Sequence, residues 1–201
     1  MSPRAAKRQD LLAGGLTLFA RDGYTRASVD AIAEQAGVST RTLYNHFGDK
    51  AGLFQAVIAA SSAEVADRHI AIIERHLGDV SELEPALVAL GLDWGRRSAE
   101  DLSEHWALVR QVSAERDHIP EAALRAWREA GPLAVRRALA ARLAELAPRF
   151  GLDLPDPELA ARHLLQLIAA DDFPGGAGSP AHEAVVRTGA RVFLRGYAGE
   201  G

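Results

Sequence analysis

The segment Ser28–Lys50, SVDAIAEQAGVSTRTLYNHFGDK, decides the fold class of the N-terminal part of this 201-residue chain. Apolar residues recur at helical spacing on both sides of Gly37, which indicates two short helices joined by a tight turn. Ser28 and Ser39 stand where a side chain caps the start of each helix. Two helices joined in this way are typical of a helix-turn-helix. We therefore expect the second helix to project from the surface and to present its outer side chains to a partner.

The outward positions of that second helix carry hydrogen-bonding side chains, where a solvated face without a task would more often carry Glu and Lys. Arg41 is long enough for a bidentate contact with guanine, and Asn45 suits adenine. Tyr44 is expected to turn its ring inward and its hydroxyl to a phosphate. Hydroxyl groups and helix starts also suit phosphate oxygens. The predicted DNA-binding residues are Ser28, Ser39, Thr40, Arg41, Thr42, Tyr44, Asn45, His46 and Lys50.

Residues 19–54, FARDGYTRASVDAIAEQAGVSTRTLYNHFGDKAGLF, resemble the N-terminal DNA-binding domain of the TetR (tetracycline-repressor-like) family of bacterial regulators. The resemblance implies a dimeric, mostly repressing transcription factor whose third helix enters the major groove. It also implies a variable C-terminal domain that binds a small ligand and the partner subunit. The chain departs from the family at Gly14 and Gly15, where members usually carry alanine. Glycine inside a helix costs up to about 1 kcal/mol relative to alanine.

Charge divides the chain into a basic N-terminal part and an acidic remainder. The whole chain has a net charge of −4, whereas residues 1–52 carry a net +2 and the rest a net −6. This asymmetry favours two tasks in one chain. We expect a helix-turn-helix DNA-binding domain over residues 1–50 and a helical regulatory and dimerisation domain over residues 51–201.

Leucine, alanine, arginine and glutamate at spacings of three and four predict an all-α protein throughout, and alternating β-branched runs are absent. The Gly-rich segment 171–180 is expected to be a flexible loop, and it lacks the Lys and Ser/Thr of a phosphate-binding loop. The expected helices are Arg4–Asp22, Val29–Ala36, a third ending near Phe47, Lys50–His76, Ser81–Arg97, Ala99–Glu115, one starting at Pro120, interrupted at Gly131-Pro132 and continuing to Phe150, Glu158–Ala170 and Ala181–Tyr197.

The C-terminal part, especially REAGPLAVRRALAARLAEL and LPDPELAARHLLQLI, is similar to the AefR-like C-terminal regulatory domain of some TetR-family members. The resemblance implies that the last two helices pair with their twins in a four-helix bundle. Apolar residues overfill one face of each helix, which agrees with this; the alternative is that these faces cover the protein's own core. The predicted dimer-interface residues are Leu164, Leu165, Ile168, Val185, Val186, Gly189, Val192 and Phe193.

Aromatic residues of the helical body are candidates for a ligand pocket. Pockets in helical proteins lie between helices and are mostly apolar with a few polar groups. Trp106 and Arg110 are four residues apart and share a helix face. Core packing is the alternative role for each tryptophan. The candidate pocket residues are Phe54, Trp94, Trp106, Arg110 and Trp127.

Several function classes lack support in the sequence. The chain has no cysteine, which excludes disulfides, thiol catalysis and thiolate metal sites. Its seven histidines show no metal-binding spacing, so no metal, cofactor or catalytic residue is predicted. The sequence shows no nucleophile–base pair and no pair of acidic residues of the kind that an all-helical enzyme would need. No secretion signal or membrane span is visible, which predicts a cytoplasmic protein without membrane contact.

The sequence therefore predicts a homodimeric transcriptional repressor that binds double-stranded DNA at a near-palindromic operator. A small, lipophilic effector of unknown identity is expected to release it. The alternative is a constitutive regulator or adaptor whose C-terminal domain binds a protein and no small ligand.

Overall fold

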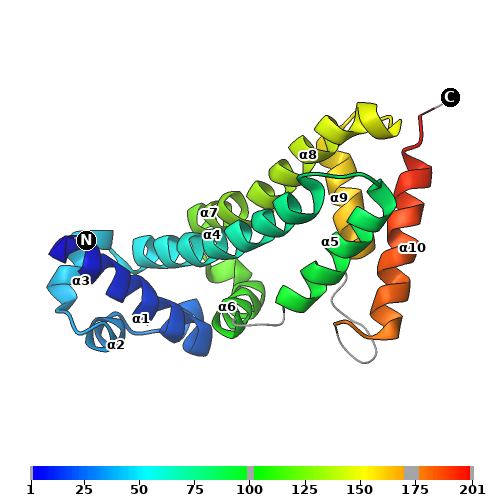
Figure 1. The fold of residues 1–201 in the computed structure, drawn as a ribbon. Coiled ribbons are helices and arrows are strands. Elements are labelled where there is room, and N and C mark those ends of the chain that lie inside the picture. The colour runs from blue at the N-terminus through cyan, green and yellow to red at the C-terminus, as the bar shows by residue number, and fades with distance from the viewer. Residues whose placement is uncertain (1, 99–101, 170–176, 200–201) are drawn as a thin grey trace. The chain divides into compact units, whose positions relative to one another are not determined.

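The computed structural model describes residues 2–98, 102–169 and 177–199 (Figure 1). Part of the predicted loop 171–180 and the predicted helix start at residue 99 lie outside these residues. The helices are α1 (Pro3–Arg26), α2 (Val29–Gln35), α3 (Thr40–Phe47), α4 (Lys50–Leu77), α5 (Leu83–Ser98), α6 (Ser103–Ala114), α7 (Glu121–Arg128), α8 (Ala134–Phe150), α9 (Pro157–Ile168) and α10 (Pro180–Gly196), with a short 3₁₀ turn (Arg116–His118) and a π-helical turn (Glu129–Leu133).

The predicted all-α class is confirmed for the described residues. They contain no β-strand, and only an isolated antiparallel bridge joins Leu152 to Ala198. Within the same ranges, no helix is both long and apolar enough for a membrane crossing. Nor does this part of the chain hold a group of three or more His, Asp or Glu side chains arranged for a metal ion.

Local capping explains why the first helices begin and end close to their predicted positions. Ser28 and Ser39 cap α2 and α3, accepting hydrogen bonds from the backbone N–H groups of Ala31 and Thr42. Gly37, between the two helices, has φ +64°, a conformation that favours glycine. The backbone of the first helix leaves the helical conformation at Gly23, as predicted, with φ +79°; beyond this kink a short helical stretch continues α1 to Arg26.

The region around Pro120 and Pro132 departs from the prediction. Pro120 precedes α7 as its N-cap residue and is not its first helical residue. The Gly131-Pro132 pair does not break the helical path, because a π-helical turn over Glu129–Leu133 connects α7 to α8. A proline has no N–H to donate, and a π-helical turn accommodates an irregular hydrogen-bond ladder without ending the helix.

The chain folds into two compact units. The first comprises the chain up to Ala66 together with Leu102–Pro132, and the second comprises the remainder. The predicted boundary at residues 50 and 51 concerns functional regions and stays a prediction.

The core of the first unit is built from α1 to α3, the start of α4, and α6 and α7. Helix α1 lies along α6. The Phe19 ring meets the Phe54 ring edge-on at 4.9 Å, and Tyr24 lies 4.8 Å from Phe54. Beside this aromatic group, the Glu115 carboxylate at the end of α6 accepts hydrogen bonds from the Thr25 N–H at 2.7 Å and the Thr25 hydroxyl at 2.8 Å. The connection between α1 and α2 is thereby tied to α6.

In the second unit, α9 and α10 pack against each other, α8 lies against α9, and α10 lies against α5. Close approach depends on small residues. A Cβ atom on Gly91 of α5 would lie 2.5 Å from the Val186 side chain, and one on Gly189 of α10 would lie 2.3 Å from the Leu167 carbonyl oxygen. Since real Cβ atoms do not come this close, glycine is required at both positions for the observed helix separation.

Candidate nucleic-acid interface

Helix α3 is held against the first unit by its apolar side. Leu43 is fully buried, and so is Ile32 of α2, which belongs to the same core. The turn between the two helices is closed by the Val38 N–H, which donates to the Ala33 carbonyl at 3.0 Å. With one side of α3 fixed to the core, the orientation of its opposite side is determined by the helix period.

The opposite side of α3 exposes long polar side chains. Arg41, Tyr44 and Asn45 are exposed, and Tyr44 is 47% accessible. The Tyr44 ring is therefore more open than the predicted inward position implies. Among the described residues, none makes an ion pair or side-chain hydrogen bond with these three. Their donors and acceptors are available to a partner outside the molecule.

The hydroxyl groups at the start of α3 are used within the protein. Thr40 donates to the Asp30 carboxylate of α2 at 3.0 Å, and the Ser39 and Thr42 hydroxyls share a hydrogen bond of 2.9 Å. Ser28 caps α2 at 3.4 Å from the Ala31 N–H. These residues order the turn and the beginning of α3, and their predicted contact with phosphate stays a prediction.

Lys50, at the start of α4, lies half-buried beside the α1–α2 connection. Its ammonium donates to the Thr25 carbonyl at 3.0 Å and lies 5.2 Å from the centre of the Tyr24 ring. Burial lowers the pKa of Lys50, and the nearby Glu115 charge opposes this shift. These two contacts hold the charge beside the α1–α2 connection.

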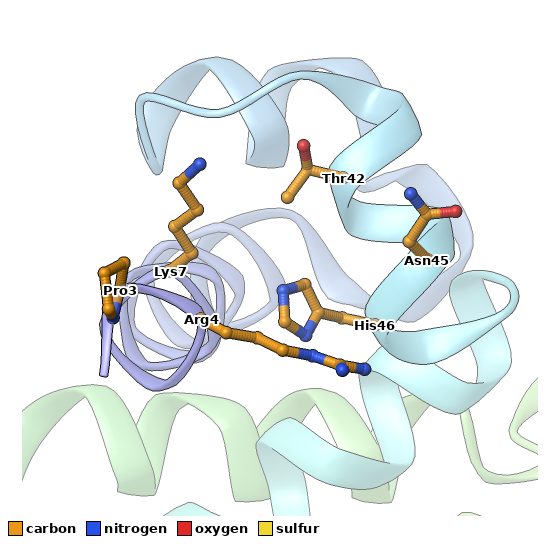
Figure 2. Close-up of a pocket in the computed structure, with 6 residues that line it drawn as sticks. All are labelled: Pro3, Arg4, Lys7, Thr42, Asn45 and His46. Atoms are coloured by element: carbon orange, nitrogen blue, oxygen red, sulfur yellow. The ribbon is translucent and has the colours of Figure 1, made fainter. Parts of the chain in front are cut away.

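Sequence reasoning missed the contribution of the first helix to this surface. Pro3, Arg4 and Lys7 of α1 lie opposite α3, as Figure 2 shows, and a concavity of about 410 Å³ separates the two helices. We call it the α1–α3 groove; its lining residues are Pro3, Arg4, Lys7, Thr42, Asn45 and His46. The sequence signal that could have revealed this contribution is the pair of cations Arg4 and Lys7, three residues apart. The prediction counted them only in the net charge of the N-terminal part.

The five predicted pocket residues are distributed over both units, and their role in ligand binding stays a prediction. Phe54 is 1% exposed and is a core residue, because the rings of Phe19 and Tyr24 cover it. Trp94 belongs to the second unit, where it stacks on His69 with 4.1 Å between ring centres. The other three belong to the first unit: Trp106 and Trp127 are half-buried, and Arg110 is exposed.

The predicted dimer residues divide into two groups. Leu164, Ile168, Val186, Gly189 and Phe193 are buried within the second unit's own core, the alternative that the sequence left open, and Leu165 is half-buried. Val185 and Val192 of α10 are 43% and 52% exposed. Leu159 of α9, which the prediction did not include, is 44% exposed. In the single chain only Val185, Val192 and Leu159 of these residues are exposed, and their predicted contact with a partner subunit stays a prediction.

Two family models match the chain. Residues 11–57 match the model described as bacterial regulatory proteins, tetR family, and residues 101–199 match the AefR-like transcriptional repressor, C-terminal domain. The chain belongs to the TetR family. Both predicted resemblances are thereby confirmed.

Comparisons with individual proteins agree with this assignment. The chain is 38% identical over 60 residues to the HTH-type transcriptional repressor AcnR of Corynebacterium glutamicum, covering 30% of this chain and 32% of AcnR. The match thus spans about a third of that relative's length. The structure of a TetR-family transcriptional regulator from Mesorhizobium loti MAFF303099 superposes with a TM-score of 0.81 at 25% identity, covering 98% of this chain and 100% of the other. For the flavonoid-responsive regulator FrrA, the TM-score is 0.70 at 28% identity, with the same coverage.

Proposed function

We propose that this chain is a sequence-specific DNA-binding transcriptional repressor. The observation that carries the proposal is the exposed polar side of α3, with Arg41 and Asn45 free of partners among the described residues. Arg41 suits guanine and Asn45 suits adenine in the major groove. Membership of the TetR family and the name of AcnR, a transcriptional repressor, support the same function.

Dimerisation completes the proposal. Leu159, Val185 and Val192 expose apolar area on α9 and α10, and covering it with a second copy removes it from water. A symmetric dimer presents two copies of α3 to half-sites about 34–36 Å apart, one turn of the duplex. The proposed operator is therefore near-palindromic.

Release from DNA is assigned to a lipophilic small molecule that binds the helical body. The name of FrrA, a flavonoid-responsive regulator, supports this class of effector. The effector needs only to bind more tightly to the state with lower DNA affinity. A coupling of about 1–3 kcal/mol weakens DNA binding about 5- to 150-fold. If saturating duplex leaves the effector's Kd unchanged, the coupling is refuted.

Footprinting on DNA upstream of the chain's own gene tests the function directly. We expect protection of a near-palindromic site, and no protection of any upstream sequence contradicts the proposal. In the same assay Arg41→Ala should relax discrimination at one base pair by about 1–3 kcal/mol. Lys50→Ala should instead weaken binding to all sequences alike and lower the salt slope by about 0.9 per bound chain. If the two variants behave identically, the separation of base from phosphate contacts is wrong.

Thermal-shift measurements with lipophilic compounds separate the repressor from the alternative regulator without a small ligand. A ligand that binds only the folded state raises the unfolding temperature in a concentration-dependent manner. Stabilisation by a member of a flavonoid series supports an effector site. A body that no lipophilic compound stabilises supports the constitutive alternative.

A further inference from the structure

We propose that the α1–α3 groove seats a backbone phosphate of duplex DNA, with Arg4 and Lys7 as its cations. The inference rests on the proposed DNA-binding function and adds a sequence-independent contact to it. It assigns part of the DNA surface to α1, which lies outside the helix-turn-helix.

The geometry of the groove favours a strand that runs beside α3. Figure 2 shows Arg4 extending from α1 toward α3, past His46, while Lys7 leaves α1 in a different direction. Asn45 lines the same groove from α3. A strand whose base is read by Asn45 therefore passes next to two cations.

The charge of the groove suits an anion. Arg4 and Lys7 are exposed, and no carboxylate in the described ranges forms an ion pair with either. None of the six lining residues is acidic. A space of about 410 Å³ is many times the roughly 30 Å³ share of one water molecule, which leaves room for a phosphate group.

Phosphate chemistry explains why this contact matters for the neighbouring α3. Contacts to phosphate fix the orientation of a protein on the duplex but carry no sequence information themselves. Two contacts on α1, across the α1–α3 groove from α3, restrict the angle at which α3 enters the major groove of the duplex. Arg4 and Lys7 are therefore assigned to affinity and register, and Arg41 and Asn45 to base discrimination.

Arg8 provides a matched control on the same helix. It is exposed and carries the same charge as Arg4, but its guanidinium lies 5.5 Å from the centre of the Phe47 ring and does not line the groove. Replacing Arg8 thus removes one positive charge from α1 and leaves the groove intact.

The experiment measures binding of the full-length chain to a fluorescein-labelled, mixed-sequence duplex of about 30 base pairs by anisotropy, over a range of salt concentrations. The slope of log K against log salt is negative, and each lost phosphate contact reduces its magnitude by about 0.9. The double variant R4A/K7A should therefore lower the slope by about 1.8 per bound chain. Between about 50 and 200 mM salt, wild-type affinity should fall about 12-fold more than that of the double variant for each bound chain. R8A should leave the slope at its wild-type value, and circular dichroism should show all variants folded.

The outcomes separate this inference from the function on which it rests. A double variant with wild-type slope and affinity overturns the groove contact and leaves DNA binding intact. If R8A loses as much slope per removed charge as R4A/K7A does, the groove contact is also overturned, because any charge on α1 then has the same effect. A wild-type chain that binds no duplex at low salt overturns the proposed function itself.

Discussion

Two neighbouring substitutions in α1, Gly14→Ala and Gly15→Ala, should differ in their effects on stability, and only the first should stabilise the protein. Both glycines are buried in a helix, where alanine is favoured over glycine by up to about 1 kcal/mol. At Gly14 an added Cβ would lie 3.4 Å from both Gln35 Cγ and the Ile32 carbonyl oxygen, an ordinary contact. We therefore expect Gly14→Ala to stabilise the protein by about 0.5–1 kcal/mol.

At Gly15 the same methyl group meets α4. The Cβ would lie 2.7 Å from Val57 Cγ2, well inside the 3.5–4.0 Å of optimal carbon contacts. Val57 is buried and β-branched, so its side chain cannot rotate away freely. Overpacking of this kind costs about 1–3 kcal/mol, which offsets or exceeds the gain in helix propensity. The net effect of Gly15→Ala should lie between neutral and about 2 kcal/mol destabilising.

Urea unfolding followed by circular dichroism measures both effects, with protein concentration held constant because the proposed dimerisation would make stability depend on it. The m-value should stay unchanged, so that the midpoint reports stability. Removing Val57 Cγ2 in Val57→Ala should relieve the clash, giving a coupling of about 1 kcal/mol with Gly15→Ala in a double-mutant cycle. The packing argument is refuted if Gly15→Ala stabilises the protein as much as Gly14→Ala does.

Two other predictions concern the second unit's exposed face and a buried histidine. Val192→Glu places a charge on the proposed dimer face and should produce monomers in sedimentation experiments. The control Ala141→Glu, at an exposed position of α8, should leave the oligomeric state unchanged. A dimer that stays intact in Val192→Glu would exclude this face. His105 is buried, with Nδ1 2.8 Å from the Ser61 hydroxyl, and burial lowers its pKa below the ordinary 6.5, against the opposing charge of Glu64. Its neutral form stabilises the fold fully above pH 6.5, and this contribution is lost as the pH falls toward the folded-state pKa. His105→Gln should therefore flatten the decline of unfolding free energy on acidification, and an unchanged decline would show that other groups cause it.

Helix boundaries were predictable where caps determine them and less so elsewhere. Ser28 and Ser39 act on backbone groups three residues away, so the beginnings of α2 and α3 follow from the sequence alone. The Gly131-Pro132 pair predicted a break, but the chain passes through it as a π-helical turn. Gly131 is buried there, and a Cβ added to it would lie 3.1 Å from the Ser62 Cβ, a close approach to α4 that no local rule contains.

The sequence by itself determined the all-α class, the helix-turn-helix and the identity of the side chains on the outer face of α3, because helix period and capping act over a few residues. Tertiary packing decided which apolar residues of α9 and α10 are covered: Leu164 and Phe193 are inside, whereas Val185 and Val192 are exposed. It also created the α1–α3 groove, since Lys7 and Asn45 are distant in the chain and meet only across packed helices. Periodicity marks an apolar face without naming its neighbour, so the partner of each face depends on long-range contacts.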